Sequence, residues 1–283
     1  MDGPWPILLA ILAGTVPFVV SVICFMRHWI VAGPIEFQPF ERDQIPVAFQ
    51  EREEIFSSQL RYLGFHAIGA CRWKWNRKVE AFCTVWIRND IVAGVNVVVG
   101  TSKRRSAVMI GLGQEYMNDS SIGVINYPDW LALNPDVFDL PSVDHVAKLD
   151  EILQAVIAKR RGGRLPFIPA DAMQYINRET DLWRERVVKA GLYRLNAKGD
   201  RYWPTLKCLG RVLRTQWSNR RSFRLGRCRG FRKTNQMLME FGFPDLEALK
   251  AASNAAFPVI RATEGGVVTG ASQSPPPRTS PSP

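Results

Sequence analysis

An uncharged segment at the start of the chain limits what the whole protein can be. From Gly3 to Met26 no side chain is charged, and most side chains are apolar. A helix over this segment would extend roughly 36 Å at about 1.5 Å per residue, enough to cross a hydrocarbon core of about 30 Å. Its whole circumference is apolar, which is unusual for a helix of a globular domain. We therefore predict a transmembrane anchor over residues 1–33, with residues 5–26 in the lipid bilayer.

A cleaved signal peptide is the alternative interpretation of this segment. Signal peptides have a positive start, a shorter apolar run and small residues at the cleavage site. Here no Lys or Arg precedes the run, and Arg27, His28 and Trp29 follow it, which favours the anchor. Basic residues beside a span favour its cytoplasmic end. Arg27 and Arg42 thus predict a single-pass membrane protein whose residues 27–283 lie in the cytoplasm.

The chain after the anchor is long and apolar enough to bury a core. Hydrophobic residues make up 46% of the sequence, with 9 Trp and 15 Phe. The last stretch differs, because residues 263–283 are rich in Gly, Ser and Pro and would bury too little apolar surface to offset the entropy of ordering. We predict a disordered tail there.

Residues 45–161 have the pattern of a small α+β domain. Helical spacing of apolar residues over 46–63 and 143–161 flanks a region rich in Val, Ile, Phe and Trp. Turn residues divide that region into short strands, as in an antiparallel β-meander. The predicted strands are residues 65–75, 79–88, 91–99, 107–112 and 122–127. The predicted fold class is therefore α+β, with an N-terminal transmembrane helix and an antiparallel β-meander flanked by helices.

Residues 165–257 are predicted to form a basic helical subdomain with a β-hairpin. We expect a helix over about 170–190, a hairpin over 191–203 and further helices from Pro204 and near residues 236–242. On the helix that begins at Pro204, the spacing predicts one apolar stripe, formed by Leu206, Leu209, Leu213 and Trp217.

The net charge of the chain is concentrated in this subdomain. Lys and Arg total 37 against 26 Asp and Glu, which gives a net charge of +11. The excess equals the 11 basic residues between Arg201 and Lys233, where no acidic residue occurs. Such a segment favours phosphates, anionic lipid headgroups or an acidic protein. The residues predicted to bind an anionic surface are Lys207, Arg211, Arg214, Arg220, Arg221, Arg224, Arg227, Arg232 and Lys233.

A set of short strings extends along the chain: Phe37-Gln38-Pro39, Leu63-Gly64-Phe65, Leu140-Pro141, Gly191-Leu192-Tyr193-Arg194, Tyr202 and Pro204-Thr205-Leu206-Lys207. In these strings the chain resembles uncharacterised bacterial proteins with one N-terminal transmembrane span and a soluble α+β body. The resemblance covers about residues 36–240. It implies this architecture and no assigned activity.

Residues 190–207 are also similar to the wing of winged-helix domains, where a hairpin and a helix end the domain. The three-helix core that should precede a wing is not evident, because residues 160–169 have the composition of a loop. This resemblance implies the alternative function, a membrane-tethered nucleic-acid-binding protein.

No strong catalytic or metal-binding motif occurs in the sequence. The three histidines are isolated from one another, and the five cysteines have no CxxC spacing. Gly111-Leu112-Gly113 lacks the third glycine of a dinucleotide loop and is interpreted as a turn at the end of a strand. We predict no cofactor and no metal, and we favour a non-enzymatic protein. An enzyme remains an alternative that would require a polar cleft on the meander.

The predicted function is binding of the membrane surface, or of a protein partner, by the cytoplasmic body. Anionic headgroups attract nearby Lys and Arg, and an apolar stripe can lie in the interface. An anchor in residues 5–26 would raise the effective concentration of the basic segment at the bilayer.

Overall fold

The computed structural model describes residues 31–32, 36–76, 79–100, 107–127, 134, 136–199, 201–211 and 229–256. The predicted membrane span at residues 5–26 and the predicted tail at residues 263–283 lie outside these ranges. Among the helices within these ranges, none is both long and apolar enough to cross a membrane.

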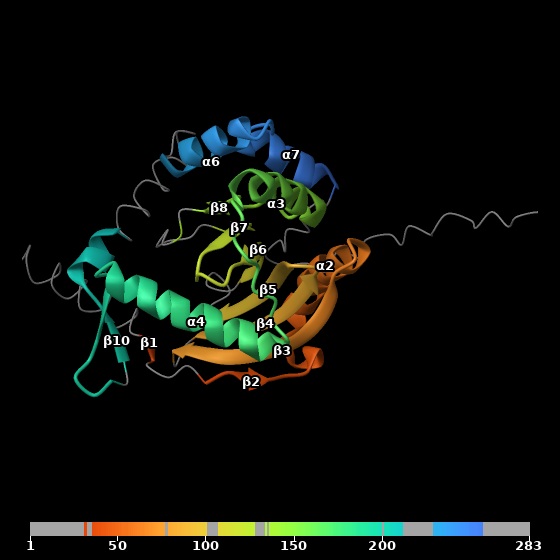
Figure 1. Cartoon of the computed structure of the whole chain (residues 1–283). Coiled ribbons are helices and arrows are strands. Elements are labelled where there is room, and N and C mark those ends of the chain that lie inside the picture. Colours follow the sequence, from red (N-terminus) through yellow and green to blue (C-terminus); the bar gives the residue numbers. More distant parts are fainter. Residues whose placement is uncertain are drawn as a thin grey trace, which may run out of the picture.

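Within the described ranges, a seven-stranded sheet lies at the centre of the fold, and its strands follow one another in sequence order (Figure 1). Neighbouring strands are antiparallel except β7 and β8, which are parallel. The strands are β2 (Gln38–Pro39), β3 (His66–Asn76), β4 (Val79–Arg88), β5 (Ile91–Gly100), β6 (Ala107–Glu115), β7 (Ser121–Ile125) and β8 (Val137–Asp139). The predicted α+β class and the meander from β3 to β7 are confirmed. Strands β2 and β8 are not predicted, because they are too short to show alternation.

Helices pack against both faces of this sheet (Figure 1). Since side chains alternate along a strand, Val95 and Ile110 lie on one face, and Cys83 and Val85 lie on the other. The short helix η1 (Arg42–Gln44) leads into the first of the helices. On the face of Val95 and Ile110 lie α2 (Val47–Tyr62) and α3 (Val146–Arg160), and α6 (Arg229–Glu240) and α7 (Leu246–Ala256) add residues to the same buried cluster. Helix α4 (Ala172–Lys189) packs on the face of Cys83 and Val85.

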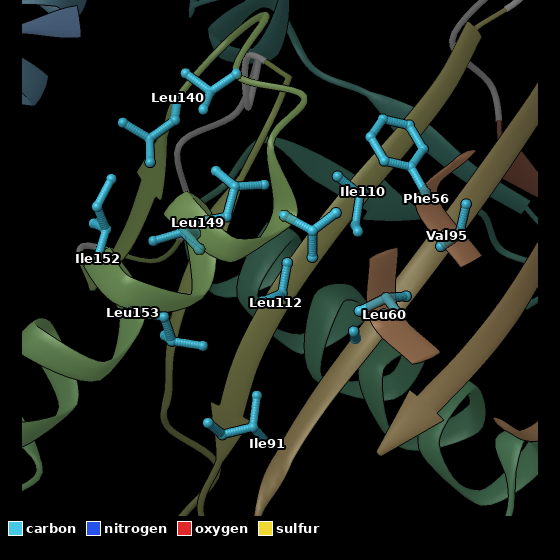
Figure 2. Packing of buried hydrophobic residues seen from close by; sticks show 14 of the residues in the cluster. Phe56, Leu60, Ile91, Val95, Ile110, Leu112, Leu140, Leu149, Ile152 and Leu153 are labelled. Carbon is cyan, nitrogen blue, oxygen red and sulfur yellow. The ribbon is translucent and has the colours of Figure 1, made fainter. Parts of the chain in front are cut away.

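The larger buried cluster fills the space between the sheet, α2 and α3. Figure 2 shows Leu60 of α2 and side chains of α3 among residues of β5 and β6. Met237 of α6 and Leu246 of α7 belong to the same cluster. Residues of both predicted domains, 45–161 and 165–257, therefore contribute to one buried core. The division of the chain into these two domains stays a prediction.

Helix α2 has a buried face that its apolar residues alone do not reveal. Phe56 and Leu60 are buried, but Ile55 is 36% exposed. The remaining positions on the buried face are polar, since Glu53 and Ser57 are fully buried one turn apart. The Ser57 hydroxyl donates a hydrogen bond of 2.6 Å to Glu53 Oε1. The polar pair interrupts the apolar stripe and hides the buried face in the sequence.

The hairpin predicted over residues 191–203 is present beside the C-terminal end of α4. After α4 the chain passes through Gly191, whose φ of +66° is readily adopted by glycine. It then forms β9 (Tyr193–Leu195), which pairs antiparallel with β10 (Arg201–Pro204). Strand β1 (Val31–Ala32) pairs with β10, and residues 206–211 form a helix after the hairpin.

Candidate functional site

The structure describes part of the basic segment that the sequence singles out. Lys207 is exposed, and its Nζ donates a hydrogen bond of 2.8 Å to the carbonyl oxygen of Ala190. Arg211 is half-buried on the same helix and is the last described residue before residue 229. The backbone of Arg232 and Lys233 belongs to α6. The other residues of the predicted surface lie outside the described ranges: Arg214, Arg220, Arg221, Arg224 and Arg227.

The first two members of the apolar stripe predicted on the helix after the hairpin differ in their exposure. Leu206 is 73% exposed, whereas Leu209 is buried. The inward position next to Leu209 is taken by Cys208, which is fully buried against Val187 and Leu192. A cysteine fills this position because the space beside α4 and the hairpin suits a small apolar side chain. Residues 213 and 217 lie outside the described ranges.

A second feature, not predicted from the sequence, is a cavity of about 390 Å³ between the sheet and α4. Helix α4 packs on β3 and β4 through Ala172 and Ile176, which lie in a cluster with Cys71 and Val85. Most of the lining residues come from β5, β6 and β7 on one side and from α4 on the other. The cavity therefore lies beside the region where α4 meets the sheet.

Glycines form much of the cavity floor. Gly94 of β5 lies opposite Gly111 of β6, and Gly113 of β6 lies opposite Gly123 of β7. All four residues share the face of the sheet that is turned toward α4, so the floor there is largely backbone. Gly111-Leu112-Gly113 is thus part of the interior of β6, and its interpretation as a turn is wrong.

These glycines differ in what surrounds them. A Cβ atom at Gly113 would lie 3.1 Å from the carbonyl oxygen of Ile122, and one at Gly123 would lie 3.1 Å from that of Leu112. Backbone of a neighbouring strand therefore favours glycine at both positions, because a Cβ would force that backbone to shift by a few tenths of an ångström. At Gly94 the nearest atoms would lie at 3.5 Å or more, which is ordinary contact. Gly94 has no such close backbone neighbour and adjoins the open space.

Two carboxyl groups meet at the wall of the cavity. Glu115 at the end of β6 is only 5% exposed and hydrogen-bonds to Glu179 of α4. Burial, followed by the charge and hydrogen bond of Glu179, raises the pKa of Glu115 to about 9, although Arg186 and Arg178 act in the opposite direction. Glu115 is therefore protonated at neutral pH. Among the described residues, Glu115 Oε2 and Glu179 Oε1 have no hydrogen-bond partner.

Two arginines of α4 near the carboxyl pair have their Nη2 atoms engaged, whereas the buried Nε of Arg178 has no partner among the described residues. Arg178 Nη2 donates hydrogen bonds to Asp119 Oδ1 at 2.6 Å and to the carbonyl oxygen of Tyr116 at 2.9 Å. Arg186 Nη2 donates to the carbonyl oxygen of Asp119 at 2.7 Å. Both guanidinium groups thus tie α4 to the turn between β6 and β7. Their positive charges stabilise the ionised form of nearby carboxyl groups, while their Nη2 atoms remain bonded to this turn.

Aromatic rings line other parts of the cavity wall. Phe37 and Trp73 are packed edge to face, with ring centroids 5.5 Å apart. Tyr175 and Trp183 contribute from α4, and Tyr127 contributes from the chain after β7. Burial raises the pKa of Tyr175 well above its ordinary value, and the nearby charges of Glu179 and Glu115 add to the effect. Tyr175 therefore remains a neutral phenol at physiological pH.

The cavity also borders Cys83 of β4, which faces Cys71 of β3 across the strand pair. Burial raises the pKa of both thiols, that of Cys71 to about 12. Both therefore stay protonated and behave as small apolar side chains. Among the described residues, no group of His, Cys, Asp and Glu is arranged to hold a metal ion.

Sequence reasoning misses this site because its residues come from separate elements. One signal is present: Gly111, Gly113 and Glu115 recur at every second residue, which is the spacing of one strand face. The comparisons with known protein families, curated proteins and solved structures find no match. The resemblance to bacterial membrane proteins accordingly stays a prediction, and the function must be inferred from the geometry of the molecule.

Proposed function

We propose that the body of this protein binds a small organic molecule in the cavity between the sheet and α4. The observation that carries the proposal is the buried pair of carboxyl oxygens, Glu115 Oε2 and Glu179 Oε1, without a partner among the described residues. An unsatisfied buried acceptor costs about 1–3 kcal/mol. A bound molecule that donates hydrogen bonds to these oxygens would offset that cost.

The dimensions and lining of the cavity support the same proposal. Its volume of about 390 Å³ lies within the range of roughly 300–1,000 Å³ that is typical of small-molecule sites. Aromatic and aliphatic side chains surround a few convergent polar groups, as such sites require. Glycine within a strand costs about 0.5–1 kcal/mol relative to alanine, and it often marks a close approach of a ligand to the backbone.

Binding is favoured over catalysis by the chemistry of the lining. The described lining residues include no histidine, and Cys83 carries a protonated thiol. These residues therefore offer neither an imidazole base nor a thiolate nucleophile. The proposed protein is a receptor-like body attached to a membrane through residues 5–26, with the body on the cytoplasmic side.

A fragment screen with the full-length protein in detergent micelles tests this function. Ligand-detected NMR would identify fragments that bind, and each would be repeated with Gly94→Leu, which places a side chain in the cavity. The matched control is Ala107→Leu, an exposed position on β6 outside the cavity lining. We expect fragments that lose binding to Gly94→Leu and keep binding to Ala107→Leu. Fragments that bind all three proteins equally would argue against the cavity as the site.

A second candidate function is binding of an anionic membrane surface by the basic segment. It is favoured by exposed Leu206 beside exposed Lys207, an apolar and a basic side chain at the start of that segment. The test is hydrogen exchange of residues 206–211 with the full-length protein in nanodiscs of neutral or anionic lipid. We expect protection in anionic lipid that moderate salt removes, and no protection after charge reversal of Arg220, Arg221 and Arg224. Equal exchange in both lipids would lead instead to screens with nucleic acids and protein partners.

A further inference from the structure

We propose that the cavity binds an organic cation, an ammonium group attached to an apolar body. The inference rests on the proposed function and adds the chemical class of the ligand. It is carried by three features in or beside one cavity: the unpartnered oxygens of Glu115 and Glu179, the engaged Nη2 atoms of Arg178 and Arg186, and the aromatic wall.

The carboxyl oxygens require hydrogen-bond donors. Glu115 Oε2 and Glu179 Oε1 are both acceptors, and Glu115 is only 5% exposed. An ammonium group supplies several N–H donors together with a positive charge, which suits a pair of carboxyl groups better than a neutral amide or hydroxyl. Without a ligand, the two carboxyl groups share one proton, and this proton supplies part of the positive charge that a bound ammonium group would provide.

The positive groups nearby do not favour an anion instead. Arg178 and Arg186 each donate hydrogen bonds to the Asp119 turn, so their Nη2 atoms are directed to protein acceptors. Arg178 Nε has no partner among the described residues, but Arg178 does not line the cavity, whereas Arg186 does. An anionic ligand would have to displace those bonds and lie beside Glu115 and Glu179. Both costs oppose anion binding, because a like charge and a broken charge-assisted bond are each unfavourable.

The aromatic wall suits the body of such a cation. Phe37, Trp73, Tyr127, Tyr175 and Trp183 present π-faces or edges at the cavity. Rings attract an organic cation through their quadrupole, by about 0.5–1 kcal/mol when exposed and about 2 kcal/mol or more when water is excluded. The same rings bury the apolar part of the ligand.

Binding of a cation should release a proton. The titratable and charged groups that interact with Glu115 are Tyr175, Arg178, Glu179 and Arg186 of α4. Cys83 of β4 and Tyr127 after β7 act on Tyr175, and Asp119 in the turn accepts a hydrogen bond from Arg178. The two glutamates share a hydrogen bond that is replaced when the cation enters. The proton of Glu115 then passes to buffer, and the ammonium group takes its place as the positive partner of both carboxylates.

Three probes of one shape test the class of ligand: 2-phenylethylammonium, 2-phenylethanol and phenylacetate. Affinities would be measured by isothermal titration calorimetry with the full-length protein in detergent micelles at pH 7. We expect the cation to bind at least about tenfold more tightly than the alcohol, and phenylacetate to bind least. Titration in two buffers of different ionisation enthalpy should show proton release for the cation alone.

Substitutions identify the groups responsible. Glu179→Gln and Glu115→Gln should each reduce cation affinity about tenfold and leave the affinity for the alcohol unchanged. Glu115→Gln should also abolish proton release, a readout that an altered fold would not produce selectively. Glu185→Gln, at an exposed position on α4, is the matched control and should bind like the unaltered protein.

The outcomes separate the two proposals. Binding of the alcohol or phenylacetate as tightly as the cation, blocked by Gly94→Leu, would overturn the cation class and support the cavity as a binding site. Binding of no probe, together with fragments indifferent to Gly94→Leu, would overturn both. Cation binding that persists in Glu115→Gln and Glu179→Gln would also overturn the cation inference.

Discussion

Glu115 of β6 and Glu179 of α4 form a hydrogen-bonded carboxyl pair inside the protein. The pair joins the sheet to the helix at the wall of the cavity, beside a floor made of glycine backbone. Two arginines tie the same part of α4 to the turn after β6, so the distance between sheet and helix is held on the cavity side as well. This arrangement leads to predictions about stability, sterics and reactivity that do not depend on the ligand.

The pH dependence of stability should reveal the buried acid. The pKa of Glu115 is raised from its ordinary value of 4.5 to about 9, so the folded state holds this proton more tightly than the unfolded chain. Stability supplied by the neutral group is complete below about pH 4.5 and is lost as the pH rises toward 9. Glu115→Gln removes the titration. The melting temperature of the variant should rise relative to the unaltered protein between pH 6 and 9, by the equivalent of about 1–3 kcal/mol.

Thermal unfolding across this pH range, followed by tryptophan fluorescence, is the measurement. Glu185→Gln serves as the control because its side chain is exposed on the same helix. Parallel curves for Glu115→Gln and the unaltered protein would contradict a protonated Glu115.

The same substitution at two glycines of the cavity floor should have different effects on stability. Gly94→Ala adds a Cβ at ordinary contact distance, with Asn96 Nδ2 at 3.5 Å as its nearest neighbour. Because alanine is favoured over glycine in a strand, the variant should be neutral or more stable by up to about 1 kcal/mol. Gly113→Ala places a Cβ 3.1 Å from the Ile122 carbonyl oxygen and should lose about 1–3 kcal/mol. Urea unfolding of the two variants provides the comparison, and an equal loss in both would rule out the difference in packing.

Glu53 should contribute strongly to the stability of the fold although it is an acidic residue. It is fully buried on α2 and accepts hydrogen bonds from Ser57 at 2.6 Å and from Thr84 of β4 at 3.2 Å. Glu53→Ala leaves both hydroxyl groups without this acceptor and opens a cavity, so we expect a loss of about 2–4 kcal/mol. Glu51→Ala, at an exposed position two residues earlier, should change stability by less than about 0.5 kcal/mol. A loss of similar size in both variants, measured by urea unfolding, would show that Glu53 has no special role.

Cys71 and Cys83 should resist alkylation in the folded protein. Both side chains are buried, and burial raises the pKa of both thiols, so almost no reactive thiolate is present at neutral pH. Iodoacetamide at pH 7.5 should leave their peptides unmodified over a time in which urea-unfolded protein reacts completely. Mass spectrometry of the two peptides gives the result. Rapid modification under native conditions would indicate that this part of the sheet opens easily.

Local patterns were sufficient to predict the strands of the meander. Strands β4 and β5 combine β-branched and aromatic residues with a turn at Asn89 and Asp90, so the local preference and the observed pairing agree. Helix α2 was predicted with nearly correct bounds, but its inward face was not, because Glu53 and Ser57 are buried through partners on another element. A sequence pattern counts apolar residues and contains no information on such distant partners.

The sequence by itself therefore determined the α+β class, the order of the meander and the concentration of positive charge, since these depend on composition and on neighbours along the chain. The cavity was decided only by tertiary structure. The pairing register places Gly94 opposite Gly111, and the packing of α4 brings Glu179 to Glu115. Long-range register and helix placement depend on contacts between distant segments, and the environment that keeps Glu115 protonated arises only when those segments exclude water.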